Sequence, residues 1–190
     1  MRIRLFLLVV LHALVISFLS ITHPQAEEDE WDINDYGNYV VAAVPGQIIW
    51  GDRLRFVFEK KDKCKTMSIW FSILTMKASD NIYELEGKKI PIRINDISTV
   101  AAVEILTIKP AFNNNAHFVM LGAPGKKDVV EFTAIVMNIY NKDNRFSITL
   151  LNEDNFDPDK YFNVLNNSWK LDKLPQKIKL AQELCNQIPL

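Results

Sequence analysis

The chain has 190 residues and a formal net charge of −1, with hydrophobic residues at 48% and charged residues at 24%. This length fits one domain plus processing segments, and this composition is that of a globular protein, not a disordered one. The charge is far from the basic excess of a nucleic-acid-binding protein, so no nucleic-acid partner is expected.

The N-terminal segment, residues 1–26, has the features of a secretory signal peptide. Arg2 and Arg4 give a positive start, residues 5–19 are mostly apolar, and Ala26 is a small residue suited to cleavage. The apolar segment is shorter than the ~20 residues that a membrane span needs. We therefore expect export to the periplasm or the extracellular space, with no stable membrane span after cleavage. An uncleaved N-terminal anchor is the alternative.

An acidic arm follows over residues 27–38. Its acids are Glu27, Glu28, Asp29, Glu30, Asp32 and Asp35. Charged segments near chain ends usually stay solvated, so this arm is predicted to be a solvated tail. The alternative is that it folds back on the rest of the chain, where basic residues are slightly in excess.

Residues 39–190 are predicted to form a single β-rich domain, because short apolar segments alternate with turn signals. The predicted strands are 39–44, 53–59, 66–76, 90–95, 99–108, 117–121, 145–151 and 169–171. About 7–8 short strands at this spacing predict an antiparallel β-sandwich or a small barrel. A C-terminal helix is expected at about 175–187, with its apolar residues near one face.

Two prolines give further expectations about the strands. Pro91 cannot donate to a hydrogen-bond ladder, so the strand at 90–95 is predicted to lie at a sheet edge. Pro110 is predicted to end the strand at 99–108.

Residues 129–140 fit either a helix or a strand. Val129, Phe132 and Val136 have the spacing of a helical face, and Asp128 with Glu131 suggests a capping box. However, β-branched residues dominate the segment and disfavour a helix. A strand over 131–140 is favoured, followed by a hairpin turn at 141–144.

Cys64 and Cys185 are the only two cysteines. In an exported chain two cysteines have one obvious pairing, so a disulfide is predicted between them. This bond would join the basic loop after residue 59 to the C-terminal helix. Two unpaired thiols are the alternative.

Few residues could support catalysis. His117 is the only histidine after residue 26, and it is expected to be an ordinary half-buried strand residue. Glu153, Asp154, Asp157 and Asp159 are expected to be capping or solvated acids, without the pattern of a calcium loop. No catalytic residue, metal site or cofactor is predicted, and no nucleotide-binding or nucleophile-elbow motif is present.

One surface feature suggests a partner site. If alternate residues of the 66–76 strand face the core, then Trp70, Leu74 and Met76 point to the other face, where large apolar groups are unexpected. The predicted partner patch consists of these three residues with Lys60, Lys61, Lys63 and Lys65. The alternative is that the C-terminal helix covers Trp70, Leu74 and Met76.

These features favour an exported, non-enzymatic protein-binding module, such as an inhibitor or an immunity-type protein, with a protein partner. A hydrolase that uses His117 or the 153–159 carboxylates is the first alternative. A structural accessory of an envelope complex is the second.

Overall fold

The structure is a computed structural model that describes residues 30–48, 51–77, 81–95, 100–123, 127–153 and 155–187. The predicted signal peptide and the first residues of the acidic arm lie outside these described residues, as does Asp154.

Within the described ranges, ten strands form one antiparallel sheet in the order β1-β2-β3-β4-β7-β6-β5-β9-β10, with β8 beside β4. The strands are β1 (Asp32–Asp35), β2 (Tyr39–Pro45), β3 (Arg53–Glu59), β4 (Thr66–Thr75), β5 (Lys89–Ile94), β6 (Val100–Ala111), β7 (Ala116–Gly122), β8 (Lys127–Asp128), β9 (Arg145–Leu150) and β10 (Asn166–Lys170). The prediction of a mainly β, antiparallel fold is confirmed.

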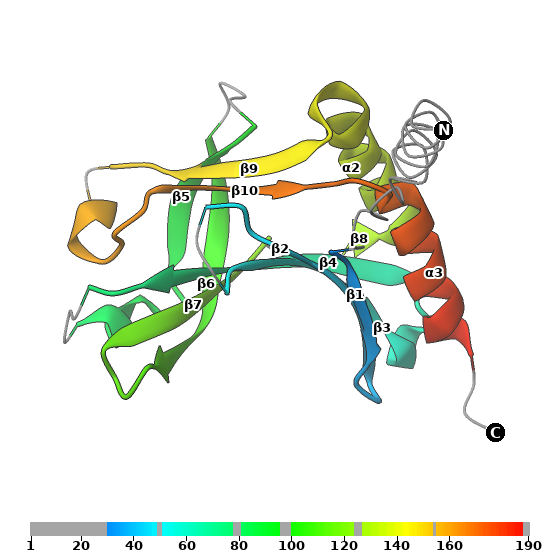
Figure 1. Cartoon of the computed structure of the whole chain (residues 1–190), viewed down its shortest axis with the longest axis horizontal. Coiled ribbons are helices and arrows are strands. Elements are labelled where there is room, and N and C mark those ends of the chain that lie inside the picture. Colours follow the sequence, from blue (N-terminus) through cyan, green and yellow to red (C-terminus); the bar gives the residue numbers. More distant parts are fainter. Residues whose placement is uncertain are drawn as a thin grey trace, which may run out of the picture.

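The sheet folds over on itself, so that β9 and β10 form a layer above β2, β3 and β4 (Figure 1). The backbone N–H of Gln47, just after β2, donates to the carbonyl of Ser168 in β10 over 2.9 Å. Trp169 of β10 lies fully buried between the layers, with its ring 5.8 Å from that of Phe71 and 5.9 Å from that of Phe146. The core therefore fills the space inside the folded sheet.

The alternation of β3 determines which of its faces the core occupies. Leu54, Phe56 and Phe58 are completely buried. Phe56 lies opposite Ile69 of β4, and both belong to the main hydrophobic core. Because successive strand residues point to opposite faces, Arg55 and Val57 lie on the outer face of the sheet.

The C-terminal helix and its disulfide agree with the sequence prediction. Helix α3 (Leu174–Asn186) has Pro175 in its first turn, where a missing N–H costs nothing. Cys64 and Cys185 are bonded, with their Cα atoms 6.1 Å apart. The buried residues of α3 are Leu174, Ile178, Ala181 and Cys185, and all of them belong to the main core.

The prediction of a strand over 131–140 is wrong, because these residues lie in helix α2 (Val129–Asp143). The Asp128 carboxylate accepts a hydrogen bond from the Val130 N–H over 2.8 Å and caps the first turn. The helical spacing and this cap outweigh the low helix propensity of the β-branched residues. The predicted hairpin turn is wrong for the same reason: α2 runs into it and ends at Asn144, which has a positive φ of 47°.

Both proline predictions are wrong. β5 lies between β6 and β9, not at an edge. The Pro91 carbonyl accepts a hydrogen bond from the Leu151 N–H, just beyond the end of β9. In a strand the nitrogen and the carbonyl of one residue point to the same side, so the Pro91 nitrogen also points toward β9. The missing N–H of Pro91 therefore faces the point where β9 stops pairing. β6 continues through Pro110 to Ala111, where β7 is its only neighbouring strand in the described chain.

The prediction of a solvated tail is wrong for residues 32–35, which form β1 and pair with β2. Asp32 forms an ion pair with Arg53, and Asp35 accepts from Lys60 over 2.6 Å. The alternative, in which the arm folds back on basic residues, is correct for this part.

The remaining described elements are short. They are the 3₁₀ helices η1 (Lys60–Asp62), η2 (Ile82–Leu85) and η3 (Pro158–Lys160). η3 begins directly after Asp157 and ends at Lys160.

Candidate binding cleft

The outer face of β2, β3 and β4 carries a second apolar cluster, separate from the main core. It is built from Val41, Ala43 and Val57, with Tyr39 and Trp70 packed against them. Cross-strand pairing places these side chains together, since Val41 lies opposite Val57 and Arg55 opposite Trp70. The sheet is thus apolar on both faces here, although only the inner face is closed by the second layer.

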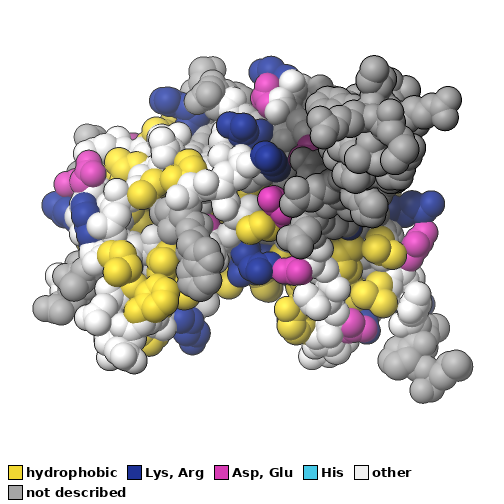
Figure 2. All heavy atoms as spheres, viewed as in Figure 1, with side chains coloured by type: hydrophobic (Ala, Val, Ile, Leu, Met, Phe, Trp, Pro, Cys, Tyr) yellow, Lys and Arg dark blue, Asp and Glu magenta, His cyan; other side chains and the backbone are white. Residues whose placement is uncertain are grey.

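A cleft of about 550 Å³ opens over this cluster. Its lining residues are Asp32, Asn34, Tyr36, Tyr39, Val41, Ala43, Arg53, Arg55, Val57, Trp70 and Met120. The elements concerned, β1–β4 and β7, border the notch between the two lower lobes of the molecule, where hydrophobic, basic and acidic side chains meet (Figures 1 and 2). This size and this mixture of apolar walls with a few polar groups are those of a ligand pocket.

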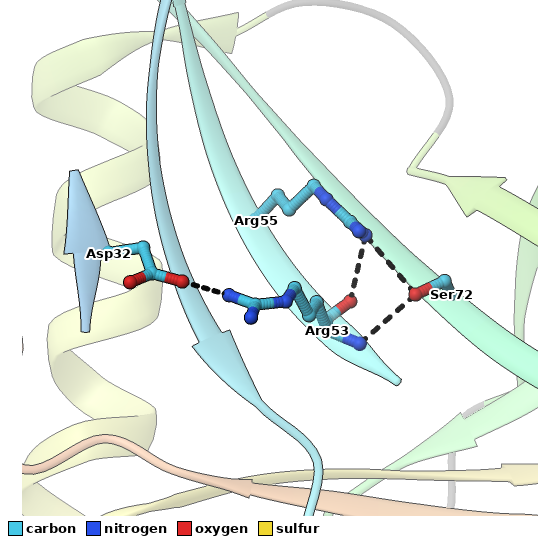
Figure 3. A network of polar contacts seen from close by, with 4 residues as sticks. All are labelled: Asp32, Arg53, Arg55 and Ser72. Carbon is cyan, nitrogen blue, oxygen red and sulfur yellow. Dashed lines mark hydrogen bonds and ion pairs between the residues drawn. The ribbon is translucent and has the colours of Figure 1, made fainter. Parts of the chain in front are cut away.

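Two arginines and an aspartate provide the polar side of the cleft (Figure 3). The Arg53 guanidinium reaches toward β1 and pairs with Asp32. Arg55 reaches instead toward β4, where its Nη1 donates to the Ser72 hydroxyl and to the Arg53 carbonyl, each over 3.2 Å. Ser72 also accepts from the backbone N–H of Arg53, so one hydroxyl fixes both arginines.

Arg55 differs from Arg53 in its lack of an ion pair within the part of the chain that the structure describes. It forms no ion pair with any residue that the structure describes, and only Nη1 of its guanidinium donates a hydrogen bond there. Burial, followed by the nearby positive charge of Arg53, lowers the pKa of Arg55. Arginine nevertheless stays protonated at neutral pH. The cleft therefore contains a half-buried positive charge with unused donors.

Asp52 is the described acid whose charge acts on Arg55, but it offsets little of the positive charge of that side chain. Its carboxylate is fully buried and accepts from the Leu74 N–H over 2.6 Å and from the Asn167 side chain over 2.5 Å. Burial raises the pKa of Asp52 to about 7, against the opposing effects of these two hydrogen bonds and of Arg55. At neutral pH the carboxyl group is thus only partly ionised, and it serves mainly to join β4 and β10.

The structure separates the three apolar residues of the predicted patch. Trp70 lines the cleft, but Leu74 is buried at 8% exposure and Met76 lies beyond the end of β4 at 56% exposure. The C-terminal helix does not cover Trp70. Its buried side chains pack into the main core with Phe56, on the opposite face of the sheet.

The four lysines of the predicted patch lie at the end of the β3–β4 hairpin, not around the cleft. Lys60 bonds to Asp35, while Lys65 is five residues from Trp70 along the chain, which is about 16 Å in a strand. None of these four residues, Lys60, Lys61, Lys63 and Lys65, lines the cleft.

The hydrolase alternative depends on His117 or on the acids of 153–159. His117 is buried in β7, with its ring against the edge of Tyr83 at 5.4 Å, and its Nδ1 has no hydrogen-bond partner in the described chain. No serine, cysteine or carboxylate bonds to it there, as a nucleophile–base pair would require. Asp157 caps η3 by accepting from the Asp159 N–H, as expected of a capping acid.

Glu153 and Asp157 also line a larger, more polar cleft of about 1190 Å³ between β5 and the loop after β9. Three lysines share this lining: Lys88, Lys89 and Lys160. Acidic and basic side chains are thus mixed along this cleft.

Two properties of the described residues concern other kinds of function, namely metal binding and membrane crossing. No three His, Cys, Asp or Glu side chains come together there in a way that could hold a metal ion. Likewise, none of the helices found in these residues is both long and apolar enough to cross a membrane.

Comparison with protein-family models, with curated proteins and with solved structures finds no match to the chain. Its function therefore has to be inferred from the cleft itself.

Sequence reasoning found Trp70 but missed the arginines beside it. Arg53 and Arg55 alternate with buried residues on β3, a pattern typical of an ordinary solvent-facing side of a strand. The sequence does contain a signal for Arg55. It belongs to the predicted strand next to that of Trp70, and the short loop between these strands places the two residues in neighbouring positions of a hairpin. Tyr39, Asp32 and Met120 come from β2, β1 and β7, whose register cannot be derived from alternation alone.

Proposed function

We propose that this chain is an exported, non-catalytic binding module that contacts a protein partner through the cleft on the outer face of β2–β4. The observation that carries the proposal is the second apolar cluster on the outer face of the sheet, with the partly exposed side chains of Trp70, Tyr39 and Arg55 at its surface. Tryptophan, tyrosine and arginine are the residues most enriched where interfaces gain most of their binding energy. Here they surround a concave site, into which a partner side chain fits.

The rigid base of the cleft also supports a binding role. Val57 is 1% exposed and Val41 is 9% exposed, so the floor is packed before any ligand arrives. The Tyr39 and Trp70 rings, with centroids 6.4 Å apart, rest on this floor. A prepared surface of this kind loses little conformational entropy on binding.

Export is the second part of the proposal. The apolar segment at 5–19 after two arginines supports it, and a disulfide between Cys64 and Cys185 is compatible with an oxidising compartment. Expression of the full chain with N-terminal sequencing of the product tests this part. A mature N-terminus close to residue 27 is expected, whereas a retained Met1 in all recovered protein would contradict it.

The binding role is tested by immobilising three forms of the mature protein and identifying what each retains from the producer's medium or envelope extract. The forms are wild type, Trp70→Ala, and the control Tyr83→Ala, which removes an exposed aromatic ring that does not line the cleft. We expect one protein to be retained by wild type and Tyr83→Ala, and at least tenfold less of it by Trp70→Ala. Equal retention by all three forms would reject the cleft as the contact site.

A further inference from the structure

The cleft contains two arginines but only one described ion pair, and this excess positive charge indicates the kind of ligand that the cleft would bind. Arg53 is neutralised by Asp32, whereas the hydrogen-bond partners of Arg55 among the described residues are only the Ser72 hydroxyl and a backbone carbonyl. A half-buried cation without an ion-pair partner is costly, because burial removes it from water and two hydrogen bonds to neutral oxygens replace only part of the lost solvation. An incoming carboxylate would supply that missing partner.

The donors of Arg55 suit a carboxylate better than a neutral group. A guanidinium presents several N–H groups in a planar fork, and Arg55 uses one nitrogen for both of its hydrogen bonds. The remaining nitrogens have no partner among the described residues. Charge-assisted hydrogen bonds of this kind are about twice as strong as neutral ones.

The walls of the cleft indicate what must accompany the carboxylate. Val41, Ala43 and Met120 are apolar, and Tyr39 and Trp70 supply two aromatic faces. An apolar or aromatic side chain covers these groups, while an acid next to it reaches Arg55. Within a volume of about 550 Å³, two adjacent side chains of a polypeptide can be accommodated.

We propose that the cleft recognises an acidic side chain, Asp or Glu, adjacent to an aromatic residue on the partner protein, with the carboxylate bound by Arg55 and the ring placed against Trp70. This inference rests on the proposed function and names the chemistry of the partner at that site. The partner's C-terminal carboxylate and a neutral aromatic segment are the competing ligands.

The test uses three small probes titrated into the mature protein while the indole N–H resonance of Trp70 is followed by NMR, with Trp70→Phe to assign that resonance. The probes are N-acetyl-Trp-Glu-amide, its neutral match N-acetyl-Trp-Gln-amide, and N-acetyl-tryptophan with a free terminal carboxylate. We expect the Glu probe to bind about tenfold more tightly than the Gln probe, from one charge-assisted hydrogen-bonded contact. Tighter binding of the free-carboxylate probe than of the Glu probe would reject the side-chain source.

Arg55→Gln and Lys63→Gln form a matched pair for this titration, since each removes one positive charge. Lys63 is exposed at the hairpin end and lies outside the cleft lining. We expect the preference for the Glu probe to vanish in Arg55→Gln and to persist in Lys63→Gln. Loss of the preference in both variants would mean that only long-range charge is sensed, and would overturn the proposal.

The outcome is separable from that of the capture experiment. If Trp70→Ala abolishes capture but the Glu and Gln probes bind equally well, the cleft is the contact site and the carboxylate assignment is wrong. If the Glu probe is preferred while Trp70→Ala captures its protein normally, the chemistry of the cleft stands and the proposed function fails.

Discussion

The β3–β4 hairpin has apolar side chains on both faces of the sheet, but the two faces have different surroundings. On the inner face, Phe56 and Phe71 are sealed under β9 and β10, with 0% and 1% exposure. On the outer face, Trp70 is only half-buried and looks into an open cleft. The inner face thus gains stability from burial, whereas the outer face keeps apolar surface accessible that folding does not require.

The charged residues follow the same division. The buried Asp52 has both carboxylate oxygens satisfied by protein donors at the junction between the layers. Arg55, across the sheet, has guanidinium nitrogens without a hydrogen-bond partner among the described residues. Satisfied polar groups fix a fold, while incompletely satisfied ones at a surface are available to a ligand.

The largest effect is expected on the inner face. Phe56→Ala should lower the free energy of unfolding by about 3–5 kcal/mol, because it removes a completely buried ring and leaves a cavity. Urea denaturation of wild type and variant measures the change. A loss below about 1 kcal/mol would show that Phe56 is not in a packed core, and the contrast between the faces would fail.

The disulfide should stabilise the inner face alone. Replacing Cys64 and Cys185 together by serine should lower the free energy of unfolding by about 2–5 kcal/mol, since the bond closes a loop of 121 positions. Because α3 packs only into the main core, the NMR resonance of the Trp70 indole should keep its position. A large shift of that resonance would show that the two faces are coupled.

Asp52 should make stability depend on pH. Its pKa is raised to about 7 in the folded state, so its contribution is fully present below its ordinary value near 3.8 and is lost as the pH rises through about 7. We expect wild type to lose on the order of 2–4 kcal/mol relative to Asp52→Asn between pH 4 and pH 8. Urea denaturation of both proteins across this range measures it. Parallel stability curves would contradict the raised pKa.

The smallest change in stability is expected on the outer face. Trp70→Ala should lower the free energy of unfolding by about 1–2 kcal/mol, because the ring is only partly buried and packs on a small cluster outside the main core. The denaturation series used for Phe56→Ala gives the direct comparison. A loss as large as that of Phe56→Ala would mean that Trp70 belongs to the core and is not reserved for binding.

The alternation of residues and the cysteine count were enough to predict β3, β4, α3 and the disulfide. They did not identify α2, because residues such as Val129 and Val136 have weak helix propensity and only packing against the core reveals the advantage of helical spacing. They also placed β5 at an edge, because Pro91 was judged without knowing where β9 ends.

The cleft was predictable only in part, for a physical reason. Trp70 was identified because one strand alone shows it on the wrong face. The role of Arg55 as a candidate binding residue depends on its neighbours: Asp32 pairs with Arg53, and no described carboxylate pairs with Arg55. That division of charge is set by the register of β1 against β2 and β3, which a local pattern does not encode.

The separation of 121 positions between Cys64 and Cys185 also constrains how the molecule is made. At about 5–20 residues per second, the ribosome produces Cys185 roughly 6–24 s after Cys64. During that interval the β3–β4 hairpin carries an unpaired thiol. The bond can therefore form only after every strand between the two cysteines has been synthesised.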